Sequence, residues 1–234
     1  SEREFMTSNL IVEAKNVRKS FGGKLVLDGV DFDLPQGMIY AICGSNGSGK
    51  SVFLRNLIGL MLPDSGEIKV FGRRIGKEVE FAPDTGALID QAGFLLNENA
   101  LFNLMLLAKI SGAASPQRVS EALRFVGLDP EDKMPVKAFS VGMRQRLGIA
   151  QAIMEDPKLL ILDEPTAGLD FDGQREIYDY LIQLKQMGKT ILFTSHNQNE
   201  IKLLCDRVYL MKSGKLTLWT EMLVDQDERA AYEN

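Results

Sequence analysis

The chain has 234 residues, of which 45% are apolar, and this suits one large globular domain with a sizeable core. The formal net charge of −5 argues against the net basic surface typical of proteins that bind nucleic acid, so we expect no nucleic-acid partner. The longest apolar stretch, which begins at Leu101, is interrupted by Lys109 before it reaches bilayer-spanning length, so a role at a membrane requires a partner subunit.

The N-terminal segment SEREFM has no basic region followed by an apolar stretch, and therefore does not read as a signal peptide. We interpret residues 1–5 as a cloning remnant and residues 6–234 as a single domain. Cys43 and Cys205 could pair in principle, but without an export signal we expect two reduced thiols.

Alternating apolar and polar residues predict strands on both sides of the turn FGGK. The alternation is clearest in GVDFDLP, where Val30, Phe32 and Leu34 would point to one side of a sheet. The short apolar run at 38–43 predicts a buried strand. The segment VFLRNLIGLML at 52–62 has the apolar spacing of a helix.

Between that strand and that helix lies GSNGSGKS. A flexible turn would explain the glycines, but it leaves Lys50 without a role. In a phosphate-binding loop, backbone N–H groups and the helix N-terminus would face phosphate oxygens, Lys50 would reach the β- and γ-phosphates, and Ser51 would offer its hydroxyl to Mg²⁺. The nucleotide-binding residues predicted here are Gly44, Ser45, Asn46, Gly47, Ser48, Gly49, Lys50 and Ser51.

Farther along, PDSGEIKVFGRRIG predicts short strands of an antiparallel layer. The region at about 94–138 has a mainly helical pattern, which indicates an inserted helical subdomain. Within it Ser115 can cap a helix, Pro116 suits its first turn, and Gly127 can end it.

A second small-residue motif, FSVGMRQRLGIAQAI, places Ser140 and Gly142 directly before an amphipathic helix. The simplest interpretation is a helix cap with Leu147, Ile149 and Ile153 facing the core. A helix N-terminus with a hydroxyl and a glycine is also suited to bind an anion, and both roles are compatible.

Two carboxylates end the buried strand predicted in DPKLLILDEP. Acidic residues at a strand end are often solvated loop residues, but open α/β sheets hold their ligands at this edge. We predict that Asp163 holds Mg²⁺ and that Glu164 orients or deprotonates the attacking water. The single histidine, His196, follows a third strand, TILFTS, where it could contact a γ-phosphate or hold Glu164 in position, although a structural role is the alternative. Catalysis is therefore assigned to Glu164, His196 and Lys50.

In this order the motifs resemble the nucleotide-binding subunits of ABC transporters, from Leu10 to about Trp219. The resemblance implies an α/β fold, namely a P-loop NTPase core with an N-terminal antiparallel β layer and an inserted α-helical subdomain. It also implies ATP and Mg²⁺ as ligands, a head-to-tail dimer with a second ABC ATPase subunit, a transmembrane permease subunit, and a place at the cytoplasmic face of the membrane. In such a dimer Ser140 and Gly142 act on the nucleotide of the other subunit.

The resemblance assigns further residues. Phe21 takes the place of the adenine-stacking aromatic, with a core phenylalanine as the alternative, and Asp170 belongs to the dimer-contacting loop. The signature FSVGM departs from the common LSGGQ. The glutamine that links Mg²⁺ to the transmembrane partner falls at Asp90 or Gln91, and we keep both as metal-site candidates.

The stretches TGALIDQAG and SVGMRQRLGIAQAI are similar to the branch that includes bacitracin- and lantibiotic-type peptide exporters. The implied function is ATP hydrolysis that energises export of a peptide, antibiotic or lipid-like cargo. The alternatives are an importer ATPase, a soluble ABC ATPase that acts on DNA or ribosomes, and a nucleotide switch that barely hydrolyses ATP.

Overall fold

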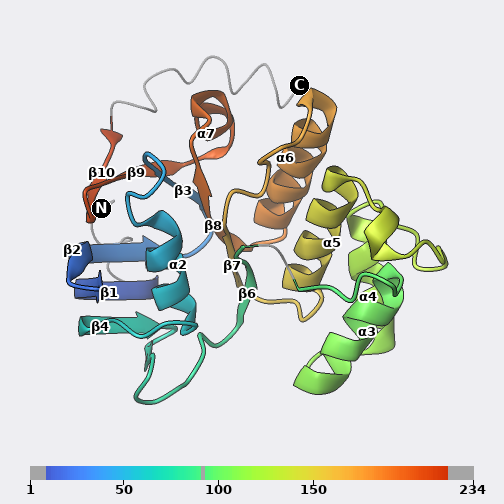
Figure 1. Cartoon of the computed structure of the whole chain (residues 1–234), viewed down its shortest axis with the longest axis horizontal. Coiled ribbons are helices and arrows are strands. Elements are labelled where there is room, and N and C mark those ends of the chain that lie inside the picture. Colours follow the sequence, from blue (N-terminus) through green and yellow to red (C-terminus); the bar gives the residue numbers. More distant parts are fainter. Residues whose placement is uncertain (1–8, 91–92, 221–234) are drawn as a thin grey trace.

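The computed structural model describes residues 9–90 and 93–220, which fold into two β-sheets with helices packed between and beside them (Figure 1). The antiparallel sheet has four strands in the order β2-β1-β4-β5. Its strands are β1 (Leu10–Phe21), β2 (Lys24–Pro35), β4 (Ser65–Val70) and β5 (Arg73–Arg74). Along β2, Val30, Phe32 and Leu34 are buried while the aspartates between them are not, as the alternation predicted.

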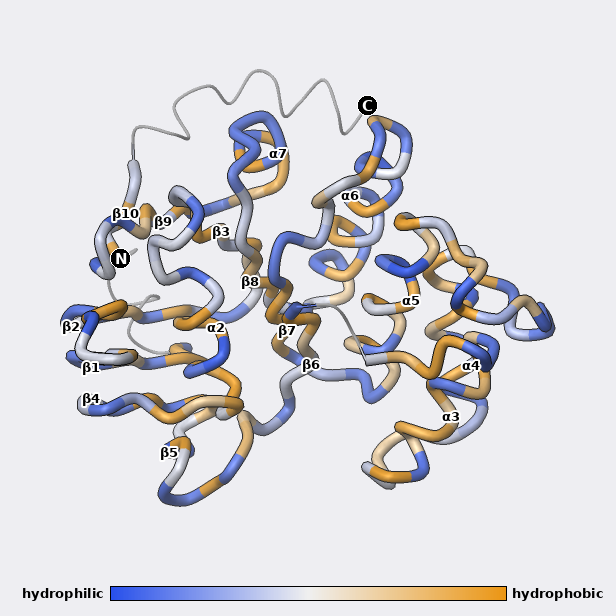
Figure 2. The backbone as a smooth tube through the Cα atoms, in the orientation of Figure 1, coloured by the Kyte–Doolittle hydropathy of each residue, from blue (hydrophilic) through white to orange (hydrophobic). Residues whose placement is uncertain are grey.

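The second sheet has six strands in the order β10-β9-β3-β8-β7-β6, parallel from β9 to β6. Its strands are β3 (Ile39–Cys43), β6 (Thr85–Leu88), β7 (Leu159–Leu162), β8 (Thr190–Ser195), β9 (Arg207–Lys212) and β10 (Lys215–Leu218). Every residue of β3, β7 and β8 is buried, because both faces of this sheet are covered. Figure 2 shows the resulting hydrophobic strands at the centre of the molecule.

Six α-helices and one 3₁₀ helix complete the described residues. They are α2 (Lys50–Ile58), α3 (Ala100–Ser111), α4 (Pro116–Phe125), η1 (Val136–Ala138), α5 (Val141–Ile153), α6 (Phe171–Gln186) and α7 (Gln198–Leu204). One apolar cluster joins α2 to the antiparallel sheet and one face of the parallel sheet. A second cluster packs α3 to α7 against the other face. The parallel sheet is thus the middle layer of the molecule.

The α/β layout with an N-terminal antiparallel layer confirms the predicted fold class. Helices α3 and α4 occupy the region at 94–138 that we predicted to be helical, while the exact extent of the domain and of its insert remains a prediction. No helix within residues 9–90 and 93–220 is both long and apolar enough to cross a membrane. Cys43 and Cys205 are buried and form no disulfide among the described residues.

One element ends earlier than predicted. The helix expected to run through 52–62 ends at Ile58, and Leu60 and Leu62 beyond it are exposed. The reason is Gly59, which has φ +88° and a neighbouring carbonyl oxygen, that of Glu80, only 2.3 Å from the position of a Cβ. A residue with a side chain could not adopt this turn, and the helix therefore ends here. The apolar pattern of the sequence continues beyond this point although the helix does not.

Candidate functional site

The parallel sheet brings three loops to one edge. In the register of neighbouring strands, Cys43 of β3 lies opposite Ser195 of β8, and Leu162 of β7 lies opposite Phe193 of β8. The loops that follow these strands therefore begin side by side. This is the edge at which open α/β sheets bind ligands.

The loop 44–49 joins β3 to α2, and its backbone is tightly constrained. Gly44 has φ +153°, and a Cβ there would lie 2.3 Å from the backbone oxygen of Met211. Ser45, Asn46 and Gly47 form the exposed rim of the loop, whereas Ser48 and Gly49 are buried at its base. Gly49 is also left-handed, with φ 112°, and this lets α2 start directly behind the loop.

The N-terminus of α2 has no capping side chain and no acidic residue in its first turn. The other five α-helices each have an Asn, Ser or Asp that accepts a hydrogen bond from a first-turn N–H. The Ser48 hydroxyl beside it is buried and has no hydrogen-bond partner. Uncapped N–H groups, the positive end of the helix dipole and an unsatisfied hydroxyl together favour an anion such as a phosphate.

Lys50 and Ser51 begin this helix. Lys50 is only 5% exposed, and its Nζ donates to the backbone oxygens of Gly44, at 2.8 Å, and Ser45, at 3.2 Å. The ammonium is thus folded back over the loop, where phosphate oxygens can replace the two carbonyls. Ser51 is half-buried in the first turn of α2.

Asp163 and Glu164 follow β7 and share one hydroxyl. Thr194 of β8 donates from Oγ1 to Asp163 Oδ1 at 2.5 Å and accepts from the Glu164 N–H at 2.9 Å. Glu164 has φ 46°, a left-handed conformation that costs free energy for a residue with a side chain, and its backbone oxygen accepts from Gln145 Nε2 at 3.3 Å. Thr194 and Gln145 thus hold the backbone of the second carboxylate in place.

Sequence reasoning missed both of these supporting residues. Thr194 reads as an ordinary residue of a buried strand, and Gln145 as a polar position on a helix. Only the pairing of β7 with β8 and the packing of α5 reveal their contacts.

His196 lies beside Glu164. The imidazole Nδ1 lies 3.6 Å from Glu164 Oε1, and the histidine side chain is 67% exposed. An imidazole this open to solvent is not a core residue, so the structural alternative for His196 is not supported. His196 follows the strand next to β3 and Glu164 follows the strand beyond it, because β8 lies between β3 and β7.

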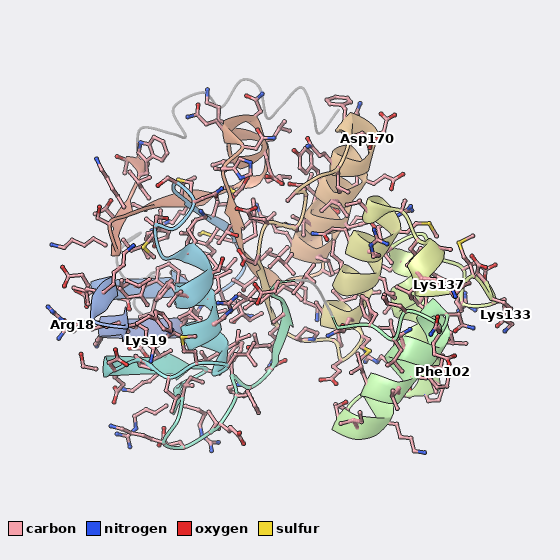
Figure 3. All side chains as sticks on the ribbon, in the orientation of Figure 1. Arg18, Lys19, Phe102, Lys133, Lys137 and Asp170 are labelled. Carbon is pink, nitrogen blue, oxygen red and sulfur yellow. The ribbon has the colours of Figure 1, made fainter. Side chains whose placement is uncertain are left out.

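Ser140 and Asp170 both cap helices at a separate surface. Ser140 Oγ accepts from the N–H of Met143 at the start of α5, and Asp170 Oδ1 accepts from the N–H of Gly173 at the start of α6. Both residues and Gly142 line a hollow of about 440 Å³, and no residue of the loop 44–49 lines it. Figure 3 shows Asp170 at the outer end of α6. The capping interpretation of Ser140 is therefore confirmed, and an anion there would be distinct from one bound at α2.

Phe21 ends β1 and is 45% exposed, so the alternative of a core phenylalanine is wrong. The ammonium of Lys19 lies 5.6 Å from the centre of its ring.

The two metal-site candidates after β6 differ in what can be described. Arg55 of α2 forms an ion pair with Asp90, with Nη2 2.6 Å from Oδ1 and 2.7 Å from Oδ2. A metal contact to Asp90 would have to compete with this arginine. Gln91 lies outside the described residues.

The donors at the edge suit a magnesium ion only together with phosphate. Within the described ranges no three His, Cys, Asp or Glu side chains cluster closely enough to hold a metal by themselves. Mg²⁺ in proteins commonly has one or two carboxylates and completes its coordination with substrate phosphates and water. A single carboxylate, Asp163, and the hydroxyl of Ser51 fit that mode.

Comparison with known proteins matches this arrangement to one family. The sequence profile described as ABC transporter covers residues 27–167. The chain belongs to the ABC transporter family. The matched region contains the loop 44–51 and the carboxylates Asp163 and Glu164.

Several ABC transporter subunits are similar over nearly the whole chain. An uncharacterized ABC transporter ATP-binding protein of Bacillus subtilis, YybJ, is 38% identical over 93% of this chain and 100% of its own length. The bacitracin transport ATP-binding protein BcrA of Bacillus licheniformis is 40% identical, covering 88% and 68%. The lantibiotic transport ATP-binding protein SrtF of Streptococcus pyogenes is 37% identical, covering 90% and 91%.

Solved ABC cassettes share the fold. The cbiO1 subunit of a Clostridium perfringens ABC transporter complex has a TM-score of 0.80 at 27% identity, over 97% of this chain and 94% of its own. A cassette solved as a dimer in a post-hydrolysis state with ADP and Pi has a TM-score of 0.78 at 26% identity, over 88% and 96%. The ABC ATPase fold of this chain is thereby established.

Proposed function

We propose that this ABC ATPase hydrolyses ATP at the edge shared by β3, β8 and β7, and that the hydrolysis drives export through a separate membrane subunit. The observation that carries the site assignment is the uncapped N-terminus of α2, with the unsatisfied Ser48 hydroxyl, at the same sheet edge as the Glu164–His196 pair. An anion-binding cradle beside a carboxylate and an imidazole is the layout that phosphoryl transfer to water needs.

Each side chain then has a defined task. The loop N–H groups and Lys50 bind the phosphates, Ser51 and Asp163 hold Mg²⁺, and Glu164 orients and deprotonates the attacking water. His196 contacts the γ-phosphate. It also keeps the Glu164 carboxylate turned toward that water. When bound, Mg²⁺ neutralises the charge on the phosphate oxygens.

The working form is a head-to-tail pair of ABC ATPase subunits. Within one chain, the hollow lined by Ser140, Gly142 and Asp170 includes no residue of the phosphate loop, so the two halves of a nucleotide site lie apart. In a head-to-tail pair the second subunit supplies the missing half. Val141 replaces a glycine of the common signature, and its side chain is 49% exposed at the rim of this hollow.

The membrane partner docks on the helical region. Phe102, Leu106 and Ile110 are exposed apolar residues on α3, and Ile110 is 75% exposed. Ile110 also lines a hollow of about 540 Å³ between the C-terminal ends of α3 and α5 and the start of β6. Phe102 projects from the outer side of α3 in Figure 3. An apolar face of this kind suits a helix of a permease at the cytoplasmic side of the membrane.

The cargo class follows from similarity alone. Relatives at 35–40% identity include bacitracin transport, lantibiotic transport and linearmycin resistance ATP-binding proteins. We therefore propose export of a peptide antibiotic or a lipid-like compound, with import as the alternative direction.

The test uses Glu164→Gln, which keeps the shape of the side chain but removes the base. We expect turnover to fall by roughly 10² to 10⁴, the usual loss for a general base, while ATP affinity is retained. Glu131→Gln, at an exposed position far along the helical region, is the matched control. An unchanged rate in the Glu164 variant would remove this residue from its role.

The membrane partner is tested by affinity capture of the Glu164→Gln protein from detergent-solubilised native membranes with ATP and Mg²⁺. A multispanning protein in stoichiometric yield supports the exporter or importer reading, and its identity indicates the cargo. Ribosomes or DNA-bound proteins would support a soluble ABC ATPase instead. A cassette that comes alone and hydrolyses ATP no faster than its Gln variant would indicate a nucleotide switch.

A further inference from the structure

A carboxylate that has no task in the proposed chemistry is buried close to the site. Glu200 lies in the first turn of α7 and is 1% exposed. Fully buried carboxylates are rare unless they have partners, because burial disfavours the charged form. At this depth Glu200 cannot contact a nucleotide or its attacking water.

Its two carboxylate oxygens accept hydrogen bonds from two different segments, the last residue of β8 and the loop after β7. Oε2 accepts from the Ser195 hydroxyl at 2.5 Å, and Oε1 accepts from the Thr166 hydroxyl at 2.8 Å. Both donors are buried as well, at 4% and 7% exposed. Ser195 Oγ also accepts from the backbone N–H of Asn197 at 3.0 Å, so the turn after β8 is fixed on both sides of His196.

These two segments carry the Glu164–His196 pair. Thr166 follows Glu164 by two residues in the loop after β7, and Ser195, the last residue of β8, directly precedes His196. The two segments are therefore linked at two points. His196 Nδ1 lies 3.6 Å from Glu164 Oε1, and the Glu200 carboxylate bonds to both segments.

The electrostatic surroundings agree with this closeness. Burial raises the pKa of Glu200, while the hydrogen bonds from Ser195 and Thr166 lower it. Smaller contributions come from His196, which lowers this pKa, and Glu164, which raises it.

We propose that Glu200 is a positioning residue for ATP hydrolysis, which ties the loop after β7 to the loop after β8 and so fixes Glu164 and His196 relative to each other. The proposal rests on the catalytic roles of that pair given above. The left-handed backbone of Glu164 is a reason why such a tie is needed, because a strained residue keeps its conformation only when its surroundings hold it. Thr194 and Gln145 hold its backbone directly, and Glu200 anchors the loop beyond it.

Two substitutions separate the tie from the charge. Glu200→Gln keeps two polar atoms in place, and hydroxyls can rotate to donate to its oxygen or accept from its NH₂. Glu200→Ala removes both hydrogen bonds and leaves the two buried hydroxyls without the acceptor to which they donate. Leu204→Ala is the matched control, because Leu204 is 4% exposed in the same helix and its truncation opens a cavity without touching the tie.

The first readout is independent of activity. His196 is the only histidine of the chain, so the imidazole resonances of the untagged full-length protein report on this residue alone. The second readout is ATPase kinetics, with kcat and KM for ATP measured separately. Thermal melts report the folded fraction of each variant.

We expect Glu200→Ala to shift or broaden the His196 resonances and to lower kcat about tenfold, with KM within about twofold. Glu200→Gln should restore both, and Leu204→Ala should lower the melting temperature without moving the resonances. Resonances that stay in place in Glu200→Ala, with a kcat that follows only the folded fraction, would overturn the tie. Displaced resonances with an unchanged kcat would overturn the positioning role of Glu200 in hydrolysis. An unchanged rate in Glu164→Gln would instead overturn the catalytic roles on which the proposal rests.

Discussion

Thr194→Val is the substitution that tests the support of the two carboxylates most directly. Valine has nearly the shape of threonine, so it fits the fully buried position in β8 without a cavity. It removes the hydrogen bond to Asp163 Oδ1 and leaves the Glu164 N–H without its acceptor. Loss of a hydrogen bond to a charged group, here Asp163, costs about 1.5–3 kcal/mol. Leaving a buried backbone donor unpaired, here the Glu164 N–H, costs about 1–3 kcal/mol.

Part of that loss belongs to folding and part to catalysis. If about 1.4 kcal/mol falls on the transition state, kcat drops roughly tenfold. The remainder lowers the melting temperature by several degrees, since about 1 kcal/mol corresponds to roughly 2–4 °C in a chain of this size. KM for ATP should stay within about threefold, because the Thr194 hydroxyl bonds to Asp163 and Glu164 and not to the phosphate loop.

Thr190→Val provides the matched control at the opposite end of the same strand. Thr190 is also fully buried, and its Oγ1 accepts from the N–H of Gly37 at 2.8 Å. It should lose stability but keep kcat. The assay is steady-state phosphate release against ATP concentration, normalised to the folded fraction. Equal losses of kcat in the two variants, or an unchanged kcat in Thr194→Val, would refute the reasoning.

Three further expectations concern separate parts of the chain. Phe21→Ala should weaken binding of a fluorescent ATP analogue roughly five- to hundredfold, the range of one lost stacking contact, and should leave the melting temperature nearly unchanged because the ring is 45% exposed. Ser140→Ala should lower stability by about 1 kcal/mol through loss of the cap to Met143, and should reduce ATP-dependent dimerisation, measured by light scattering, more than Ser115→Ala, which removes the cap of α4. Burial raises the pKa of the Cys43 thiol to about 11 from 9.0 in the unfolded chain. The unfolded state therefore loses this proton at lower pH, and stability should fall between about pH 9 and 11. If the denaturation midpoint of a Cys43→Ala protein falls just as much over this range, the thiol is not the cause.

The phosphate loop shows how far sequence reasoning reaches. Its glycines predict backbone with positive φ, and the position of Lys50 predicts a lysine at the start of a helix. The structure has both, with φ +153° at Gly44 and a buried Lys50 at the start of α2. Both requirements are local, since they concern neighbouring residues of one turn. The helix caps at Ser115 and Ser140 were predictable for the same reason.

The end of α2 shows the opposite case. Its apolar spacing continues to Leu62, yet the helix stops at Ile58 because Gly59 passes close to the carbonyl of Glu80. That contact joins residues far apart in the chain. A periodic pattern reports which side chains are apolar, and does not report where another segment forces the backbone to turn.

The sequence by itself determined the family and the order of the motifs, and it predicted roles for Lys50, Glu164 and His196, because residue type and local spacing carry that information. Only the tertiary structure decided how these groups are held. The shared hydroxyl of Thr194 and the buried tie of Glu200 depend on β7 and β8 lying in register, a consequence of burying both faces of the sheet. Such contacts arise from the packing of the whole chain, and no local pattern encodes them.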